Sequence, residues 1–167
     1  MIFSNRQKRH PAPKIKALNE FISCAAPIAG LPLEDDEAVA VNFLSSRKMR
    51  QLNLAFLGHD YDTDVISFDY RSGHMGKIAD VSAEIFICPD MAERYSIANP
   101  GASYHDEMAL YIVHGLLHAS GELDSTTEEI CSMRRKEKSA ISRLKEIFMF
   151  EKIFPARKIG KRKKKTR

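Results

Sequence analysis

Hydrophobic residues recur along this chain with two different periods. Between residues 15 and 25 they follow helical spacing, whereas residues 38–44 alternate as a strand does, so that Ala40 and Asn42 are expected to face outward. The same patterns predict strands at 2–5, 38–44, 65–68 and 81–88. Helices are expected at about 13–25, 46–57, from 89 onward, at 104–120 and at 130–148. The hydrophobic pattern therefore predicts an α+β domain with about four strands and four or five helices.

Local signals mark where these elements begin and end. Ser45 or Ser46 is suited to cap the second helix, and Gly58 to end it. The segments 103–106 and 125–128 both fit capping boxes. A loop is expected from Pro27 to Pro32. The helix at 104–120 is apolar on most sides, so we expect it to lie buried at the centre of the core.

Composition places the chain among ordinary globular proteins. Its 167 residues suit one domain, which we assign to residues 1–155, and 44% of them are hydrophobic. The three cysteines are far apart and form no C-x-x-C pair, which disfavours disulfides and cysteine zinc sites and fits a reducing compartment. No apolar run reaches the roughly 18 residues of a membrane span, and no secretory signal is evident. We therefore expect a cytoplasmic protein with no membrane partner.

Charge is distributed unevenly along the chain. Residues 157–167 hold eight basic residues and residues 1–16 hold five, with no acidic residue in either segment. The remaining residues, 17–156, carry 13 basic and 22 acidic side chains, so the net charge of +4 comes from the ends. Residues 156–167 are expected to form a disordered basic tail, because so polar a segment buries nothing.

The most informative segment is H-G-L-L-H-A-S-G-E-L-D, residues 114–124. His114 and His118 are four residues apart, so on a helix their imidazoles lie on one face and can reach one zinc ion. Gly121 stands where the helix must end, and the chain can then return Asp124 as an oxygen ligand. Two His and one carboxylate leave a coordination position open, as in catalytic zinc sites. The sequence predicts one zinc ion per chain, held by these three residues.

Two other interpretations compete with this one. Most His-x-x-x-His pairs on helices bind no metal, and Asp124 precedes a helix that it would suit as an N-cap. The spacing H-x-x-x-H-x-x-G-x-x-[H/D] is that of metzincin proteases, but these have Glu directly after the first His as general base, and here Gly115 occupies that position. A metallopeptidase is therefore disfavoured, and the remaining chemistry is metal-assisted hydrolysis of an ester or phosphodiester.

In this segment and in two others the chain resembles the YbeY family, bacterial rRNA maturation factors described as metal-dependent endoribonucleases. The family signature H-G-x-L-H-L-x-G-Y-D-H matches residues 114–124. The family's T-D-V-L-S-F matches T-D-V-I-S-F at 63–68, preceded by Leu52-Asn53, and G-D-I-x-I-C matches A-E-I-F-I-C at 83–88. The resemblance extends over roughly residues 36–150. It implies a mixed four-stranded sheet flanked by helices, a metal bound at His114, His118 and Asp124, and action on ribosomal RNA.

Three positions depart from the family pattern. Asp124 stands where the family has a third His, Leu57 stands where it has an arginine thought to act in catalysis, and Ala83 replaces a glycine. The catalytic residues are therefore unknown, with His59 and Arg71 as candidates to compensate for Leu57. By family analogy, two more polar residues are expected near the cleft, Asp64 and Ser67. His74 and His105 are expected to be surface residues.

The resemblance thus implies a single-strand-specific, metal-dependent endoribonuclease that acts in 16S rRNA 3′-end maturation and ribosome quality control. Its expected partners are ribosomal RNA and the small ribosomal subunit, and no small-molecule cofactor is expected. The alternative is a non-catalytic ribosome assembly factor with a structural metal, which Leu57 favours. The tail is expected to make non-specific phosphate contacts through five residues, Lys161, Arg162, Lys163, Lys164 and Lys165.

Overall fold

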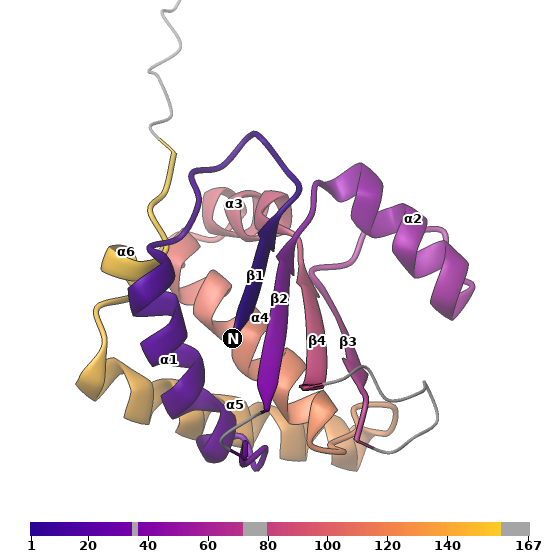
Figure 1. Cartoon of the computed structure of the whole chain (residues 1–167). Coiled ribbons are helices and arrows are strands. Elements are labelled where there is room, and N and C mark those ends of the chain that lie inside the picture. The colour runs from indigo at the N-terminus through magenta and orange to yellow at the C-terminus, as the bar shows by residue number, and fades with distance from the viewer. Residues whose placement is uncertain (35–36, 72–79, 158–167) are drawn as a thin grey trace, which may run out of the picture.

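The fold is described here from a computed structural model, which defines residues 1–34, 37–71 and 80–157. Four strands form one sheet in the order β1-β2-β4-β3. They are β1 (Ile2–Asn5), β2 (Ala38–Phe43), β3 (Val65–Asp69) and β4 (Val81–Ile87). β1 pairs with β2 and β2 with β4 in parallel, whereas β3 is antiparallel to β4 (Figure 1). The expected mixed four-stranded sheet is confirmed, and β1 and β3 are its edges.

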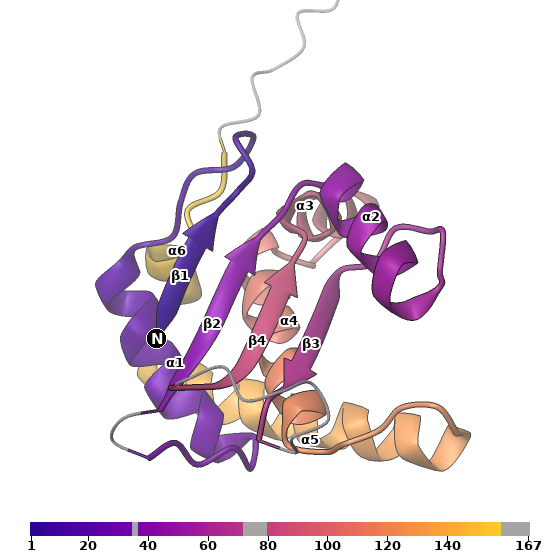
Figure 2. The same cartoon turned by 45° about the vertical axis from the view of Figure 1, so that its right-hand side comes forward.

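Six helices are present in the described part of the chain. They are α1 (Ile15–Ile28), α2 (Ser46–Leu57), α3 (Pro89–Ala98), α4 (Tyr104–Ala119), α5 (Thr127–Ile147) and α6 (Phe150–Ile153). Figures 1 and 2 show α1, α4 and α5 covering one face of the sheet, while α2 stands apart from that layer at the upper end of β4 and β3. The α+β class is confirmed, and α6 is a short element that the sequence pattern did not predict.

The central helix is α4, which packs against β3, β4, α1, α3, α5 and α6. Ten of its residues are buried, among them Met108, Ile112 and Leu116, each 0% exposed. Gly115 lets the helix approach the sheet closely, because a Cβ at this position would lie only 2.7 Å from Ile85 Cγ2 and 3.2 Å from Val65 Cγ2. This contact sets the distance between α4 and the two strands β3 and β4.

The expectations for the end of α1 and for the exposure of β2 are wrong. The loop expected from Pro27 begins later, because α1 continues through Pro27 to Ile28 and ends only where Gly30 adopts a φ of +80°. The outward positions of β2 are buried as well. Asn42 is 6% exposed because its amide donates a 2.8 Å hydrogen bond to Glu84 on β4, and Glu84 also accepts one from Tyr70. Polar side chains that hydrogen-bond to one another thus lie on the second face of the sheet. For this reason the burial of β2 does not follow the predicted alternation of inward and outward positions.

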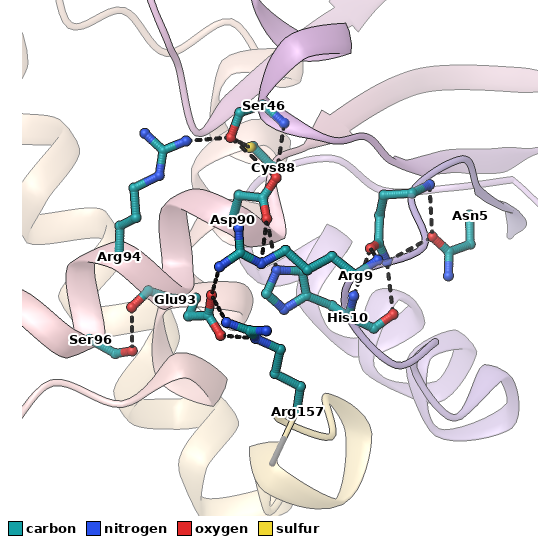
Figure 3. Close-up of polar contacts among 11 residues, drawn as sticks. Asn5, Arg9, His10, Ser46, Cys88, Asp90, Glu93, Arg94, Ser96 and Arg157 are labelled. Carbon is teal, nitrogen blue, oxygen red and sulfur yellow. Dashed lines mark hydrogen bonds and ion pairs between the residues drawn. The ribbon is translucent and has the colours of Figure 1, made fainter. Parts of the chain in front are cut away.

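A cluster of polar side chains joins distant segments at the start of α2 and α3 (Figure 3). Ser45 is the N-cap residue of α2, as expected, but its side chain makes no cap bond. Asp90 of α3 accepts from the Ser46 backbone N–H at 3.0 Å instead, and also binds His10 at 3.0 Å. Burial would raise the pKa of Asp90, but the hydrogen bonds from Ser46 and His10 lower it below its usual value.

Glu93 in the same cluster binds two arginines from opposite ends of the chain. Its carboxylate accepts from Arg9 at 2.8 Å and from Arg157 at 3.1 Å. Burial would raise the pKa of Glu93, yet the two guanidinium groups hold it below its usual value. Arg157 belongs to the tail that was expected to be disordered from residue 156 onward, but here it binds a buried carboxylate. Residues 158–167, which include the five expected phosphate contacts, and His74 lie outside the described residues.

Gly115→Ala tests the contact between α4 and the sheet. Alanine normally favours a helix over glycine by about 1 kcal/mol. Here the added methyl group meets Ile85, so we expect a net loss of about 1–3 kcal/mol in the free energy of unfolding, typical of overpacking. Urea denaturation followed by circular dichroism measures it. A variant as stable as the wild type, or more so, would contradict the close approach.

Candidate metal centre

Three side chains converge beside the end of α4. The Nε2 atoms of His114 and His118 lie 3.0 Å apart, and Asp124 Oδ2 lies 3.8 Å from the first and 3.5 Å from the second. Among the residues the structure describes, this is the group of His, Cys, Asp and Glu side chains that could hold a metal ion. The structure therefore brings together all three ligands predicted from the sequence.

The spacing of the donor atoms fits a small divalent ion. A tetrahedral zinc with ligands at about 2.1 Å places neighbouring donor atoms about 3.4 Å apart. The three distances between the donors of His114, His118 and Asp124 lie on both sides of that value. Small adjustments of exposed side chains suffice to reach it, since Asp124 is 41% exposed.

The other ring nitrogens of the two histidines are already engaged. His118 Nδ1 donates to the backbone carbonyl of Glu122 at 2.8 Å, and His114 Nδ1 lies 2.6 Å from Glu137 Oε1. A carbonyl only accepts, so Nδ1 of His118 carries a proton, and in the neutral ring Nε2 then presents a lone pair. In neutral His114, Nδ1 likewise carries the proton toward the carboxylate of Glu137, and Nε2 presents a lone pair. Two lone pairs facing each other at 3.0 Å need a cation or a proton between them, which is the arrangement of metal-ligating histidines.

The turn after α4 has a defined geometry that places Asp124. Gly121, with a φ of +99°, donates its N–H to the carbonyl of His118, and Glu122 donates to Leu117. This is a Schellman motif, and it ends the helix at Gly121, where the sequence predicted the end. The capping box of α5 is formed by Thr126 and Glu129 rather than by residues 125 and 128. The start of α5 is therefore capped without Asp124, whose carboxylate faces the histidines.

The site is electrically negative without an ion. Burial would lower the pKa of His114, but the hydrogen bond and charge of Glu137 raise it above its ordinary value, and Asp64 and Asp124 act in the same direction. The imidazole is thus stabilised in its positive form by the surrounding carboxylates. A divalent cation would gain from the same carboxylates.

Glu137 was missed by the sequence analysis. It lies on α5, 23 residues from His114 in the chain, and no short motif links the two. A signal was nevertheless present. The apolar stripe of α5 includes three buried residues, Met133, Ala140 and Leu144, and Glu137 interrupts it at helical spacing. A carboxylate on the buried face of a helix needs a partner, and here the partner is His114.

The three predicted ligands line a cleft of about 640 Å³ along the edge strand β3. The opposite wall comes from the end of α2 and the segment that follows it. Several residues expected near the site are in the lining, namely Leu57, His59, Asp64 and Ser67. Asp64 accepts a hydrogen bond from the backbone of Val65 at 3.0 Å, which fixes its carboxylate at the start of β3.

The two candidate catalytic residues differ in their surroundings. His59 lines the cleft and stacks on Tyr61, with ring centroids 5.1 Å apart and an angle of 18° between the planes. Arg71 follows β3, and its guanidinium binds Asp69 at 3.1 Å and the carbonyl of Ala119 at 2.6 Å. Arg71 thereby connects the end of β3 to the end of α4. His105 contacts the carbonyl of Phe154, away from the three ligands.

The position after His114 has no room for a catalytic side chain. Gly115 is buried against Val65 and Ile85, so a glutamate there could not point into the cleft. The site lacks the general base of a zinc protease for a structural reason, because α4 must lie close to the sheet at this residue.

The fold and the site together define an α+β protein with a His-His-Asp group in a cleft at the edge of a mixed sheet. The family model described as "Endoribonuclease YbeY" matches residues 2–145. The chain therefore belongs to the endoribonuclease YbeY family, a family of nucleases.

Individual relatives agree with this assignment. The endoribonuclease YbeY of Parabacteroides distasonis is 32% identical over 136 residues, which cover 81% of this chain and 89% of the relative. That of Bacteroides thetaiotaomicron is 33% identical over 132 residues, covering 79% and 90%. The solution structure of TM1509 from Thermotoga maritima matches with a TM-score of 0.55 and 22% identity, over 86% of this chain and 89% of that one, which shows a shared fold. None of the helices in the described residues is long and apolar enough to cross a membrane.

Glu137→Ala tests whether this carboxylate positions His114. Loss of such a partner typically weakens metal affinity 10- to 100-fold, and Glu137→Gln should weaken it less, because its amide oxygen can still accept from Nδ1. Competition with a chromophoric zinc chelator measures the affinity. Glu146→Ala, at an exposed position of the same helix, is the control. Equal zinc affinity in Glu137→Ala and Glu146→Ala would show that Glu137 does not position His114.

Proposed function

We propose that this protein is a metal-dependent endoribonuclease that cleaves single-stranded RNA, and that it acts in 16S rRNA 3′-end maturation and ribosome quality control. Zinc is the proposed ion, held by His114, His118 and Asp124, and ribosomal RNA and the small ribosomal subunit are the proposed partners. Membership of the endoribonuclease YbeY family supports the nuclease activity. The geometry of the site supports the metal dependence and the single-stranded substrate.

The observation that carries the proposal is that the three ligands face an open cleft. Structural zinc sites are closed by four protein ligands, whereas catalytic sites have three and leave one position free. Here the described residues offer three, and the third, Asp124, is 41% exposed beside a space of about 640 Å³. A bound divalent ion would supply Lewis acidity toward a phosphodiester in that space.

The cleft also carries a surface suited to an unpaired base. His59 and Tyr61 form a stacked pair in its wall, and Tyr61 is 56% exposed. Unstacked bases of single-stranded RNA bind to such aromatic faces, whereas bases inside a duplex are already stacked. The hydrogen bond between Tyr61 Oη and His59 Nδ1, at 3.0 Å, holds the two rings in place. This pair favours single-stranded RNA as the substrate.

Leu57 favours the alternative function, a non-catalytic ribosome assembly factor. It lines the cleft at the end of α2 and offers no charge to a phosphate. A protein that binds RNA at this cleft without cleaving it, with the metal in a structural role, would act as an assembly factor. Cleavage activity separates the two functions.

Removal of one ligand tests the enzyme directly. Wild-type protein should contain about one zinc per chain and should cleave single-stranded rRNA fragments but not a matched duplex. His118→Ala should not bind zinc, since one of three ligands is gone, and its rate of RNA cleavage should fall at least 100-fold. Elemental analysis and gel assays measure both. If His118→Ala cleaves as fast as wild type, a contaminating nuclease is responsible. If wild type binds zinc and never cleaves RNA, the assembly-factor alternative replaces the enzyme.

Leu57→Arg tests whether leucine at this position lowers kcat/KM for RNA cleavage. A guanidinium at this position can hold a phosphate with two parallel hydrogen bonds, so we expect roughly a 10-fold gain in kcat/KM. Leu54→Arg is the matched control, because Leu54 is also on α2 and equally exposed, at 51%, but does not line the cleft. An equal gain in both variants would mean that net charge, not the cleft position, is responsible.

A further inference from the structure

A second group of basic side chains lies on the folded part of the chain, away from the metal centre. Arg6 and Lys8 follow β1, and Arg47 and Lys48 lie in the first turn of α2; all four are exposed. The two segments are in contact, because Lys48 Nζ donates to the carbonyl of Arg6 at 3.1 Å. We call these four residues the basic platform. It occupies the end of the sheet where β1 and β2 finish.

The platform is built on a fixed backbone. Arg6 donates its N–H to the carbonyl of Phe43 at the end of β2, at 2.9 Å. Gln7 is 6% exposed, and its side chain binds the backbone of Arg9 and His10 at 2.8–3.0 Å. Lys8 is therefore carried on a turn that is tied down on both sides. The first turn of α2 is held in the same way by Asp90.

The charges of the platform are not neutralised. Nearby carboxylates are engaged by other groups: Asp90 by His10 and Ser46, and Glu93 by Arg9 and Arg157 (Figure 3). The other two arginines near α2 are also paired, Arg50 with Asp60 and Arg94 with Asp62. Among the described residues, none of the four platform side chains forms an ion pair. Four like charges on touching segments repel each other, so the platform favours a polyanionic partner.

The C-terminal segment begins against the same surface. Glu93 is 5% exposed and binds Arg9, next to Lys8, as well as Arg157. The sequence after Arg157 contains seven more basic residues. The ion pairs of Glu93 thus bring Arg9 and Arg157, which come from the two basic ends of the sequence, to one carboxylate.

α2 connects this place to the metal cleft. Its first turn carries Arg47 and Lys48, and its last residue, Leu57, lines the cleft. At 1.5 Å per residue its 12 residues extend about 18 Å, which about five stacked nucleotides span at 3.4 Å each. The helix contains no acidic residue that would repel a strand along this path.

We propose that the basic platform docks the phosphate backbone of single-stranded RNA whose neighbouring nucleotides occupy the metal cleft. This rests on the proposed function, and names the part of the folded domain that holds the substrate. RNA is favoured over an acidic protein because the platform leads along α2 to the stacked pair of His59 and Tyr61, which fits bases. The contact carries no sequence information, since it is made to phosphates.

Arg47→Gln combined with Lys48→Gln tests the platform. Each lost contact to single-stranded RNA reduces the steepness of log affinity against log salt concentration by about 0.7, so the loss of two contacts reduces it by up to about 1.4. The RNA affinity at 0.1 M salt then falls by up to roughly 25-fold. The control is Lys138→Gln combined with Arg143→Gln, which removes the same charge from exposed positions of α5. Fluorescence anisotropy with a labelled 16-nucleotide RNA in EDTA, which keeps the strand intact, measures both.

Each outcome has a distinct meaning. A weaker affinity and a smaller salt slope in the platform variant alone support the proposal. Equal losses in both variants would overturn it, because net charge would then explain the effect, and so would no loss in either. Weaker polyglutamate binding in the platform variant with unchanged RNA binding would assign the surface to acidic proteins instead. If wild type binds no RNA, the proposed function fails too; if it binds RNA and cleaves it while the platform variant matches the control, only the platform fails.

Substrate length provides a second, independent readout. A dinucleotide is too short to reach from the cleft to the platform, even when it is fully extended, so the platform variant should cleave it as wild type does. With the 16-nucleotide strand the variant should show a raised KM and an unchanged kcat. An equal loss on both lengths would show that the substitutions disturb the cleft itself, which would overturn the docking role.

Discussion

The site depends on how closely α4 approaches the sheet. At Gly115 the helix lies so near β3 and β4 that an added methyl group would fall within 2.7 Å of Ile85. His114 directly precedes that contact and His118 follows it by one turn, so both imidazoles are fixed relative to β3, which forms a wall of the cleft. The same glycine excludes the glutamate that a zinc protease would have at this position. One packing constraint therefore places the ligands and limits the chemistry available to them.

Local signals in the sequence predicted the parts of the site that are close together in the chain. The spacing of the two histidines requires only a helix, and Gly121 requires only a turn, so His114, His118 and the return to Asp124 could all be anticipated. The residues that support them could not. Glu137 reaches His114 from another helix, and Asp90 caps α2 from a position 44 residues away from Ser46. Such pairs are formed by tertiary packing, which periodicity in one segment does not report.

The fold shows the same division between local and long-range information. Strand and helix positions followed from periodicity, but the order β1-β2-β4-β3 depends on which strands pair, and burial depends on what covers each face. Asn42 illustrates this. A polar residue at an alternating position predicts exposure, yet Glu84 on the neighbouring strand satisfies its amide and allows it to be buried. The basic ends of the sequence are a further case, because only the structure shows that Arg9 and Arg157 meet at Glu93.

The electrostatics of the metal centre explain why a separate basic surface is useful. A divalent ion at His114 and His118 would face the carboxylates of Asp124 and Glu137, whose two negative charges offset its own, and Asp64 lies in the same cleft. Such a centre can polarise a phosphodiester at contact distance but exerts little net attraction on RNA from afar. Leu57 lines the cleft and adds no positive charge to that attraction. Binding energy for a polyanion must then come from elsewhere on the molecule, and the unpaired charges at the start of α2 are located where a strand entering the cleft would meet them.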